Sequence, residues 1–378
     1  MASSATSAPL QPSSVLSKDN DRPGRVVFDP SHLQNKTNIP KEYLWPLSER
    51  PDCLEELEAP VVDLKGFLQG DESSTRRAAE MVREACLTHG FFQVINHGIN
   101  PSLFHDAMTN ADQLFHLPLE TKLKIERQPG NFWGYTGAHA DRLSSKLPWK
   151  ETLSFGYDDV GSKNGIVNYF VSSLGKDFES IGWVYERYFG AMKELSLKLL
   201  ELLAISLGVD QEYFREYFKD GESVSRCNYY PPCQVPEAVL GTGPHNDPNG
   251  LTLLLQDQVG GLEVFSDGKW RAVKPEPDAL VINVGDTFMG LTNGIYKSCL
   301  HRAVVNSEIT RQSIVFFLCP RGDRVLRPPE ALVSQENPRK YPDFTWSELL
   351  SFTQNSYRVD GETLQYFSQW LLSSKATE

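Results

Sequence analysis

The sequence predicts a mainly β fold with flanking helices, an α+β protein built around an all-β barrel or jelly roll. Two features of the chain support this prediction. After Val224, many short apolar segments follow one another at close intervals, with turn residues and no helical pattern between them. Before that point, long stretches carry apolar residues at helical spacing. We therefore expect strands to form the core and helices to support it from outside.

The chain has 378 residues, which is enough for two or three domains of roughly 150 residues each. A chain of this size can bury a large core without disulfide bonds. We divide it into a flexible N-terminal extension, a mixed α/β region with a long bracing helix, a jelly-roll core and a C-terminal helical segment, at residues 1–55, 56–215, 220–325 and 326–378.

The N-terminal half is expected to mix strands and helices. In order, these are a strand at 59–64, a helix over about 74–88, a strand at 91–95, a helix over about 101–114, an irregular aromatic segment at 130–156 and a long helix over about 176–207. Gly90 is expected to end the first helix. The longest helix has an apolar residue every three or four positions, which makes one face continuously apolar. Gly208 is a suitable residue to end it.

The core is expected to consist of short strands separated by tight turns. The apolar segments lie at 251–255, 262–265, 270–273, 280–284, 303–306 and 313–318. Turn pairs such as Gly260-Gly261 and Asn293-Gly294 separate neighbouring segments. The stretch 345–372 has a helical pattern and is expected to fold back over the barrel.

Charge and cysteine content narrow the choice of partners and compartment. The formal net charge is −12, which argues against nucleic acid or an anionic membrane surface as partner. No run of eighteen apolar residues is present, so we expect no membrane span. The six cysteines form no CxxC pair, which favours reduced thiols. We expect a cytoplasmic protein that acts as a monomer on a small molecule.

A possible metal site is the most informative pattern in the chain. His245 and Asp247 lie two residues apart, so on an extended strand both side chains would point to the same side. His301 lies downstream, where a neighbouring strand could bring it back to them. Two imidazoles and one carboxylate suit ferrous iron, because they occupy one face of the metal and leave positions open for substrates. A single His-x-Asp pair is more often a surface turn, but Pro244 and Pro248 bracket this one as a short strand between turns.

A second pair of residues suits a carboxylate ligand. Arg311 and Ser313 repeat the two-residue spacing, which would place a guanidinium and a hydroxyl on one strand face. Arginine binds a carboxylate with two hydrogen bonds, and serine can add one more. A metal site beside such a pair indicates a chelating co-substrate that carries an acid group at its far end.

Together these motifs resemble those of the plant iron(II)- and 2-oxoglutarate-dependent dioxygenases. The resemblance covers about residues 59–350 and includes the metal and carboxylate motifs, the NYYPPC segment at 228–233 and the THGFFQVINHG segment at 88–98. It implies a double-stranded β-helix core at 220–325 and an N-terminal dioxygenase region at 56–215. It also implies Fe(II) on the three metal ligands, 2-oxoglutarate held by Arg311, Ser313, Tyr230 and Asn228, O2 as second co-substrate and ascorbate as reductant.

Within that family, the segment Leu147-Pro-Trp-Lys-Glu-Thr152 and the sequence NYYPPCQ resemble the gibberellin 20-oxidases. This resemblance implies stepwise oxidation and removal of C-20 from a diterpenoid acid, giving C19 gibberellins. Substrate residues are expected in and near the same segment, with apolar walls, a charged group and one carboxylate: Phe132, Trp133, Tyr135, Trp149, Lys150, Arg226 and Glu151.

Three functions remain open from the sequence. The first is a gibberellin 20-oxidase. The second is a sister dioxygenase that oxidises another gibberellin position or a flavonoid-like substrate with the same ligand set. The third is a barrel that binds a hormone without turnover. The preference for precursors with or without a 13-hydroxyl group is not readable, because pocket details decide recognition of a single hydroxyl.

Overall fold

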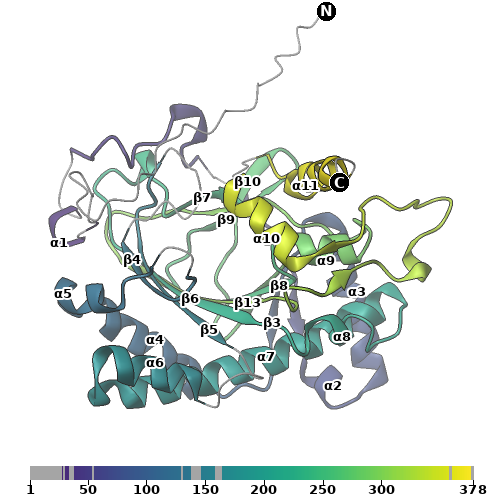
Figure 1. Cartoon of the computed structure of the whole chain (residues 1–378), viewed down its shortest axis with the longest axis horizontal. Coiled ribbons are helices and arrows are strands. Elements are labelled where there is room, and N and C mark those ends of the chain that lie inside the picture. The colour runs from purple at the N-terminus through teal and green to yellow at the C-terminus, as the bar shows by residue number, and fades with distance from the viewer. Residues whose placement is uncertain are drawn as a thin grey trace, which may run out of the picture.

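The computed structural model describes residues 28, 30–33, 38–52, 55–128, 131–137, 146–157, 164–356 and 360–375. Within these residues, two facing sheets form a jelly-roll core (Figure 1). The larger sheet has the order β2-β3-β11-β8-β13-β6-β5-β4, and the smaller has the order β1-β10-β9-β12-β7. The predicted fold class, mainly β with flanking helices, is therefore confirmed.

The larger sheet contains β2 (Val61–Asp63), β3 (Phe91–Ile95), β4 (Gly134–Gly137), β5 (Glu151–Tyr157), β6 (Ser223–Tyr230), β8 (Leu251–Gln256), β11 (Leu280–Val284) and β13 (Arg311–Leu318). The smaller sheet contains β1 (Glu55–Glu56), β7 (Thr242–His245), β9 (Leu262–Ser266), β10 (Lys269–Ala272) and β12 (His301–Ala303). A separate hairpin is formed by β14 (Val325–Leu326) and β15 (Phe344–Thr345).

The described helices are α1 (Pro30–Leu33), α2 (Lys65–Leu68), α3 (Glu72–Thr88), α4 (Pro101–Phe115), α5 (Leu119–Lys122), α6 (Gly165–Leu174), α7 (Glu179–Leu207), α8 (Arg215–Phe218), α9 (Asp286–Leu291), α10 (Trp346–Asn355) and α11 (Thr363–Lys375). Figure 1 shows α4, α6 and α7 along the outer side of the larger sheet. None of the helices among these residues is long and apolar enough to cross a membrane.

Aromatic packing joins these helices to the sheet. Phe155 of β5 is fully buried and contacts Phe170 of α6 and Tyr185 of α7, with ring centroids 5.0 and 5.4 Å apart. Such packing removes a large apolar area from water, which is the main stabilising contribution to a core of this kind. The outer face of the larger sheet is therefore filled by helices, and its inner face remains for the site.

Side chains of the strand β13 alternate between the hydrophobic core and the pocket. Ile314, Phe316 and Leu318 are buried in the core beneath the helices. The alternate residues on the same strand, from Arg311 to Phe317, line a pocket on the inner side. Successive side chains on a strand point to opposite faces, so the alternation of apolar and polar residues determines which side becomes the pocket.

Most predicted elements are confirmed, and the aromatic segment is a correction. The helices expected over 74–88, 101–114 and 176–207 correspond to α3, α4 and α7. The segment 130–156 was expected to be irregular, but β4 and β5 lie in or overlap it and form the edge of the larger sheet. Turn residues obscure the strand pattern here, and β5 is held in the sheet by β6, which lies far away in sequence, while β4 pairs with β5.

Two further expectations are corrected at the ends of elements. The strand expected at 303–306 is β12, which begins at His301 and ends at Ala303. The helix expected over 345–372 is two helices, α10 and α11. The first of them begins at a Thr345 capping box with Glu348, which defines its N-terminus locally.

The regions predicted at 56–215 and 220–325 contribute strands to one shared sheet. Strands β2 to β5 come from residues 56–215, yet they hydrogen-bond into the same sheet as β6, β8 and β13. Part of the extension at 1–55 packs firmly, since Phe28 and Tyr43 are fully buried. Both rings stand edge-on to Trp149, at 5.5 and 5.3 Å between centroids. These two residues therefore belong to the core.

Candidate active site

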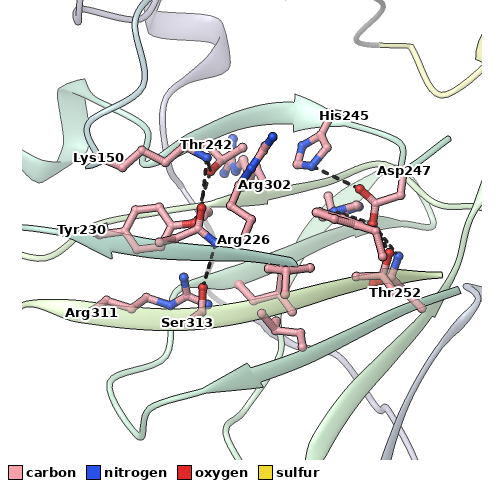
Figure 2. A pocket seen from close by; sticks show the side chains of 18 residues that line it. Lys150, Arg226, Tyr230, Thr242, His245, Asp247, Thr252, Arg302, Arg311 and Ser313 are labelled. Atoms are coloured by element: carbon pink, nitrogen blue, oxygen red, sulfur yellow. Dashed lines mark hydrogen bonds and ion pairs between the residues drawn. The ribbon is translucent and has the colours of Figure 1, made fainter. Parts of the chain in front are cut away.

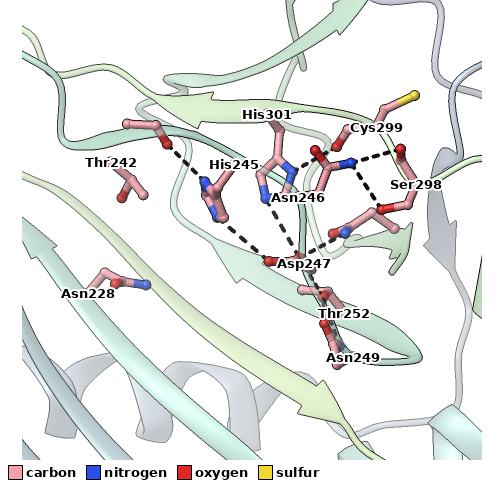
Figure 3. A network of polar contacts seen from close by, with 12 residues as sticks. Asn228, Thr242, His245, Asn246, Asp247, Asn249, Thr252, Ser298, Cys299 and His301 are labelled. Atoms are coloured by element: carbon pink, nitrogen blue, oxygen red, sulfur yellow. Dashed lines mark hydrogen bonds and ion pairs between the residues drawn. The ribbon is translucent and has the colours of Figure 1, made fainter. Parts of the chain in front are cut away.

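The three predicted metal ligands lie together. The carboxylate oxygens of Asp247 are each 3.6 Å from a histidine Nε2, one from His245 and one from His301. All three ligand atoms lie within 4.8 Å of one another. The strands β7 and β12 pair His245 directly with His301, which brings the distant histidine into place. Figure 3 shows both imidazoles turned toward Asp247.

The local backbone differs from the expected strand. The strand β7 ends at His245, so Asp247 lies just beyond it and not on a continuous extended segment. Both histidine rings are oriented by main-chain carbonyls. The Nδ1 of His245 is 2.9 Å from the oxygen of Gly243, and the Nδ1 of His301 is 3.2 Å from that of Cys299. A hydrogen on each Nδ1 would be donated there, leaving the Nε2 lone pairs for a metal.

The Asp247 carboxylate is held in its charged form. Burial by itself would raise its pKa, but the two neighbouring histidines and two hydrogen bonds lower the pKa below its ordinary value. Thr252 Oγ1 and Asn283 Nδ2 donate to the same oxygen, Oδ2, at 2.7 and 2.9 Å. A buried anion beside two imidazoles matches the donor set of an iron(II) centre. The residues present therefore fit the metal that the sequence predicted.

The predicted co-substrate residues meet on neighbouring strands. The register pairs Arg311 with Tyr230 and Ser313 with Asn228. The Asn228 amide donates to Ser313 Oγ at 3.2 Å, and the Arg311 guanidinium carbon lies 5.0 Å from the centroid of the Tyr230 ring. Because alternate residues of two paired strands share one face, four groups from two motifs converge on one end of the pocket.

Arg311 has unused hydrogen-bonding capacity at this position. It is 2% exposed, and one terminal nitrogen donates to Gln256 Oε1 at 3.0 Å. Its Nε atom is buried without a hydrogen-bond partner among the residues that the structure describes. A buried guanidinium with an unsatisfied donor is costly, and a bound carboxylate would satisfy it. This fits a dicarboxylate co-substrate.

The metal and carboxylate ends belong to one pocket. The empty space of this pocket, counted together with open solvent, is about 590 Å³. Figure 2 shows His245 and Asp247 at one side and Arg311, Ser313 and Tyr230 at the other. The lining residues are Lys150, Arg226, Asn228, Tyr230, Thr242, His245, Asp247, Thr252, Leu254, Leu262, Asn283, His301, Arg302, Ala303, Arg311, Ser313, Val315 and Phe317. Its mixture of apolar walls and a few converging polar groups is typical of small-molecule sites.

Of the seven predicted substrate residues, Lys150 and Arg226 line this pocket. Trp149 does not, which corrects the expectation that it forms a pocket wall. It is fully buried, and its indole nitrogen donates to the Pro231 oxygen at 3.1 Å. The Trp149 ring anchors the N-terminal residues described above.

The remaining predicted substrate residues also lie outside the pocket lining. Glu151 accepts hydrogen bonds of 2.5 Å from Lys122 and from Tyr135, forming a buried ion pair behind the strand. Trp133 packs against Tyr169 with ring centroids 5.1 Å apart, and Phe132 is 39% exposed. Alternation of side chains along β5 explains why Glu151 lies outside the pocket that the preceding residue, Lys150, lines, whereas Phe132 and Trp133 precede β4.

Several pocket residues were missed by sequence reasoning. The most important are the polar residues Thr242, Thr252, Asn283 and Arg302, which line the pocket, and Gln256, which accepts a hydrogen bond from Arg311. A buried polar residue in a strand is unusual and needs partners, so Asn283 within Leu280–Val284 was a usable signal. Which of these face the metal depends on strand register, which the sequence does not define.

Two parts of this chain match known protein families. Residues 221–320 match the 2OG-Fe(II) oxygenase superfamily, and residues 59–170 match the family described as non-haem dioxygenase in morphine synthesis N-terminal. Gibberellin 20 oxidase 2 of Oryza sativa is 55% identical over 90% of this chain and 87% of its own length. Gibberellin 20 oxidase 1 of Arabidopsis thaliana is 50% identical, with 92% of each chain covered.

Solved structures agree with these matches. The crystal structure of JOX2 in complex with 2OG, Fe and JA has a TM-score of 0.76 and 31% sequence identity, covering 91% of this chain and 98% of that one. The dioxygenase for auxin oxidation in rice has a TM-score of 0.68 and 28% identity, covering 82% and 99%. The chain thus belongs to the 2OG-Fe(II) oxygenase superfamily and, within it, to the gibberellin 20-oxidase family.

Proposed function

We propose that this enzyme oxidises and removes C-20 of C20 gibberellins, with 2-oxoglutarate and O2 as co-substrates, to give C19 gibberellins. The observation that supports this most is one pocket with a two-histidine, one-aspartate centre at one end and a carboxylate site at the other. The similarity to gibberellin 20 oxidases over most of the chain supports the choice of substrate.

The chain's own residues would position both reactants. His245, Asp247 and His301 would hold Fe(II), which when bound supplies O2 activation coupled to decarboxylation of 2-oxoglutarate to succinate. Arg311 and Ser313 would bind the distal carboxylate of the co-substrate and so fix its orientation toward the metal. These residues are 8% exposed or less, except for the half-buried His245, which limits the access of water to the reacting groups.

Arg226 would bind the acid group of the substrate. This residue pairs with Val315 and lies two positions before Asn228, on the same strand face. Its Nε donates to Ser154 Oγ at 3.0 Å, and its guanidinium carbon lies 6.0 Å from the centroid of the Phe317 ring. A cation held among Leu254, Val315 and Phe317 suits an apolar diterpenoid that carries a carboxylate.

Product analysis by mass spectrometry tests the proposal. The purified enzyme is incubated with Fe(II), 2-oxoglutarate, ascorbate and a C20 gibberellin, with and without a 13-hydroxyl group. We expect C-20 alcohol and aldehyde intermediates followed by a C19 product. A product oxidised at another ring position would instead show a sister dioxygenase, and binding without any succinate would show a non-catalytic barrel.

The expected compartment and oligomeric state form part of the same proposal. All five cysteines that the structure describes are free thiols, which suits a reducing compartment such as the cytoplasm. One chain supplies all three metal ligands and both co-substrate strands, so a monomer could carry the whole reaction. Gel filtration at assay concentration, with elution as a single 42.6 kDa chain expected, checks the monomer.

A further inference from the structure

A second cation lies close to the co-substrate end of the pocket. Lys150 is 6% exposed, and its Nζ donates to Thr242 Oγ1 at 3.1 Å and to Asn228 Oδ1 at 3.4 Å. The same nitrogen lies 5.9 Å from the centroid of the Tyr230 ring. These contacts join Lys150 to Asn228 and Tyr230 of the co-substrate motif and to their neighbour Thr242. Figure 2 shows Lys150 beside Tyr230 and Thr242, away from Asp247.

The strand register explains this position. Glu151 pairs with Tyr229, and Tyr230 pairs with Arg311. Extending the first pairing by one residue places Lys150 level with Tyr230 and Arg311, across three adjacent strands. Tyr230 thus has a cation on each side: the lysine nitrogen at 5.9 Å and the arginine carbon at 5.0 Å from its ring centroid.

The electrostatic environment of Tyr230 agrees with this geometry. Burial alone would raise the pKa of its hydroxyl, but the charges of Lys150 and Arg311 lower that pKa below its ordinary value. A tyrosine hydroxyl that is acidified by two cations reports a positive potential at this end of the pocket. An anionic group bound there would be stabilised by both charges.

We propose that Lys150 is a co-substrate residue: its ammonium group completes, with Arg311, Ser313 and Tyr230, the site for the distal carboxylate of 2-oxoglutarate. This assignment rests on the proposed function and revises one part of the sequence prediction, which placed Lys150 among the gibberellin residues. In this arrangement the segment 147–152 acts on the co-substrate through its lysine. Gibberellin recognition falls to Arg226, which lies four residues before Tyr230 on the same face of β6.

Calorimetry of co-substrate binding tests this assignment without any gibberellin. The enzyme is loaded with Mn(II) under anaerobic conditions and titrated with 2-oxoglutarate or with 2-oxopentanoate, which has a methyl group in place of the distal carboxylate. Lys150→Met keeps the aliphatic stem and removes the charge. We expect it to weaken 2-oxoglutarate binding by roughly ten- to a hundredfold, as for loss of a charge-assisted hydrogen bond. Lys150→Met should bind 2-oxopentanoate as tightly as the wild type does, because this oxo acid has no distal carboxylate.

Matched variants separate this role from a structural one. Lys150→Arg keeps the charge and should retain most of the affinity, and Lys146→Met, at a partly exposed lysine just before the segment 147–152, should have no effect. If Lys150→Met fails to fold, Lys150→Gln, which can still hydrogen-bond to Thr242, replaces it. In turnover, the KM for 2-oxoglutarate should rise, while the KM for gibberellin at saturating co-substrate stays within about twofold.

Two results would overturn the assignment. One is an unchanged affinity of Lys150→Met for 2-oxoglutarate. The other is an equal loss for both oxo acids, which would show that the lysine only maintains the structure. Neither result depends on gibberellin turnover, so failure of this inference and failure of the proposed gibberellin activity remain distinguishable.

Discussion

Replacement of Thr252 by valine should weaken metal binding without removing a ligand. The Thr252 hydroxyl donates to Asp247 Oδ2 at 2.7 Å, and valine has nearly the same shape but no donor. A hydrogen bond to a charged group contributes about 1.5–3 kcal/mol. Asn283 still donates to the same oxygen at 2.9 Å, so we expect the lower end of that range. This corresponds to roughly tenfold weaker binding of Fe(II) or Mn(II), within the range found when supporting residues of metal sites are lost.

Calorimetric titration of the metal-free enzyme with Mn(II) measures this effect. Thr136→Val is a matched control, because Thr136 is a buried threonine in the same sheet whose hydroxyl contacts Thr152 at 2.6 Å. The control should bind Mn(II) as the wild type does. Equal affinity of Thr252→Val and the wild type would refute the reasoning that this hydroxyl orients the Asp247 carboxylate.

The remaining predictions concern stability and thiol chemistry. Phe155→Ala should lower the free energy of unfolding by about 3–5 kcal/mol in urea titrations, because it opens a cavity among fully buried rings. Glu151→Ala should lower it by about 3–5 kcal/mol, since the Lys122 ammonium would remain buried without its carboxylate; a loss below 1 kcal/mol would contradict this. Burial raises the pKa of Cys227 to about 12 and that of Cys299 to about 11. The test uses iodoacetamide at pH 7.5, which is about one pH unit below an ordinary thiol pKa. Mass spectrometry should find both thiols unmodified in the native enzyme and alkylated after unfolding.

The sequence was sufficient for the parts of the site that depend on short-range spacing. Arg311 and Ser313 share one face of β13 because they are two residues apart, and the same spacing keeps His245 and Asp247 within one ligand cluster although Asp247 lies beyond the end of β7. The bounds of the long helix α7 were predicted within a few residues, because its apolar residues recur at regular intervals. These patterns are local, so they can be recognised without knowledge of the fold.

The rest of the site depends on strand pairing between distant segments. The strands β4 and β5 were not predicted, because the place of β5 beside β6, and of β4 beside β5, is determined by tertiary packing. Without β5, the opposite orientations of Lys150 and Glu151 could not be foreseen. The residues that support Asp247 were missed for the same reason, since Thr252 and Asn283 reach it from two different strands.

The burial of Trp149 has a similar cause. In the sequence it stands beside Lys150 in a motif associated with substrate, so it was expected at the pocket. Its indole instead packs against Phe28 and Tyr43, which precede it by more than a hundred residues. A tryptophan in a turn-rich segment gives no local sign of which distant surface will cover it.

We propose that His245, Asp247 and His301 form the iron centre of a gibberellin-oxidising enzyme. The most direct test measures CO2 released from 2-oxoglutarate labelled at C-1, with Fe(II), ascorbate and a C20 gibberellin, for the wild type and for His301→Ala. We predict release that depends on gibberellin in the wild type and is lost in the variant, with circular dichroism showing that the variant is folded. Full activity of His301→Ala would contradict the assignment of the metal ligands.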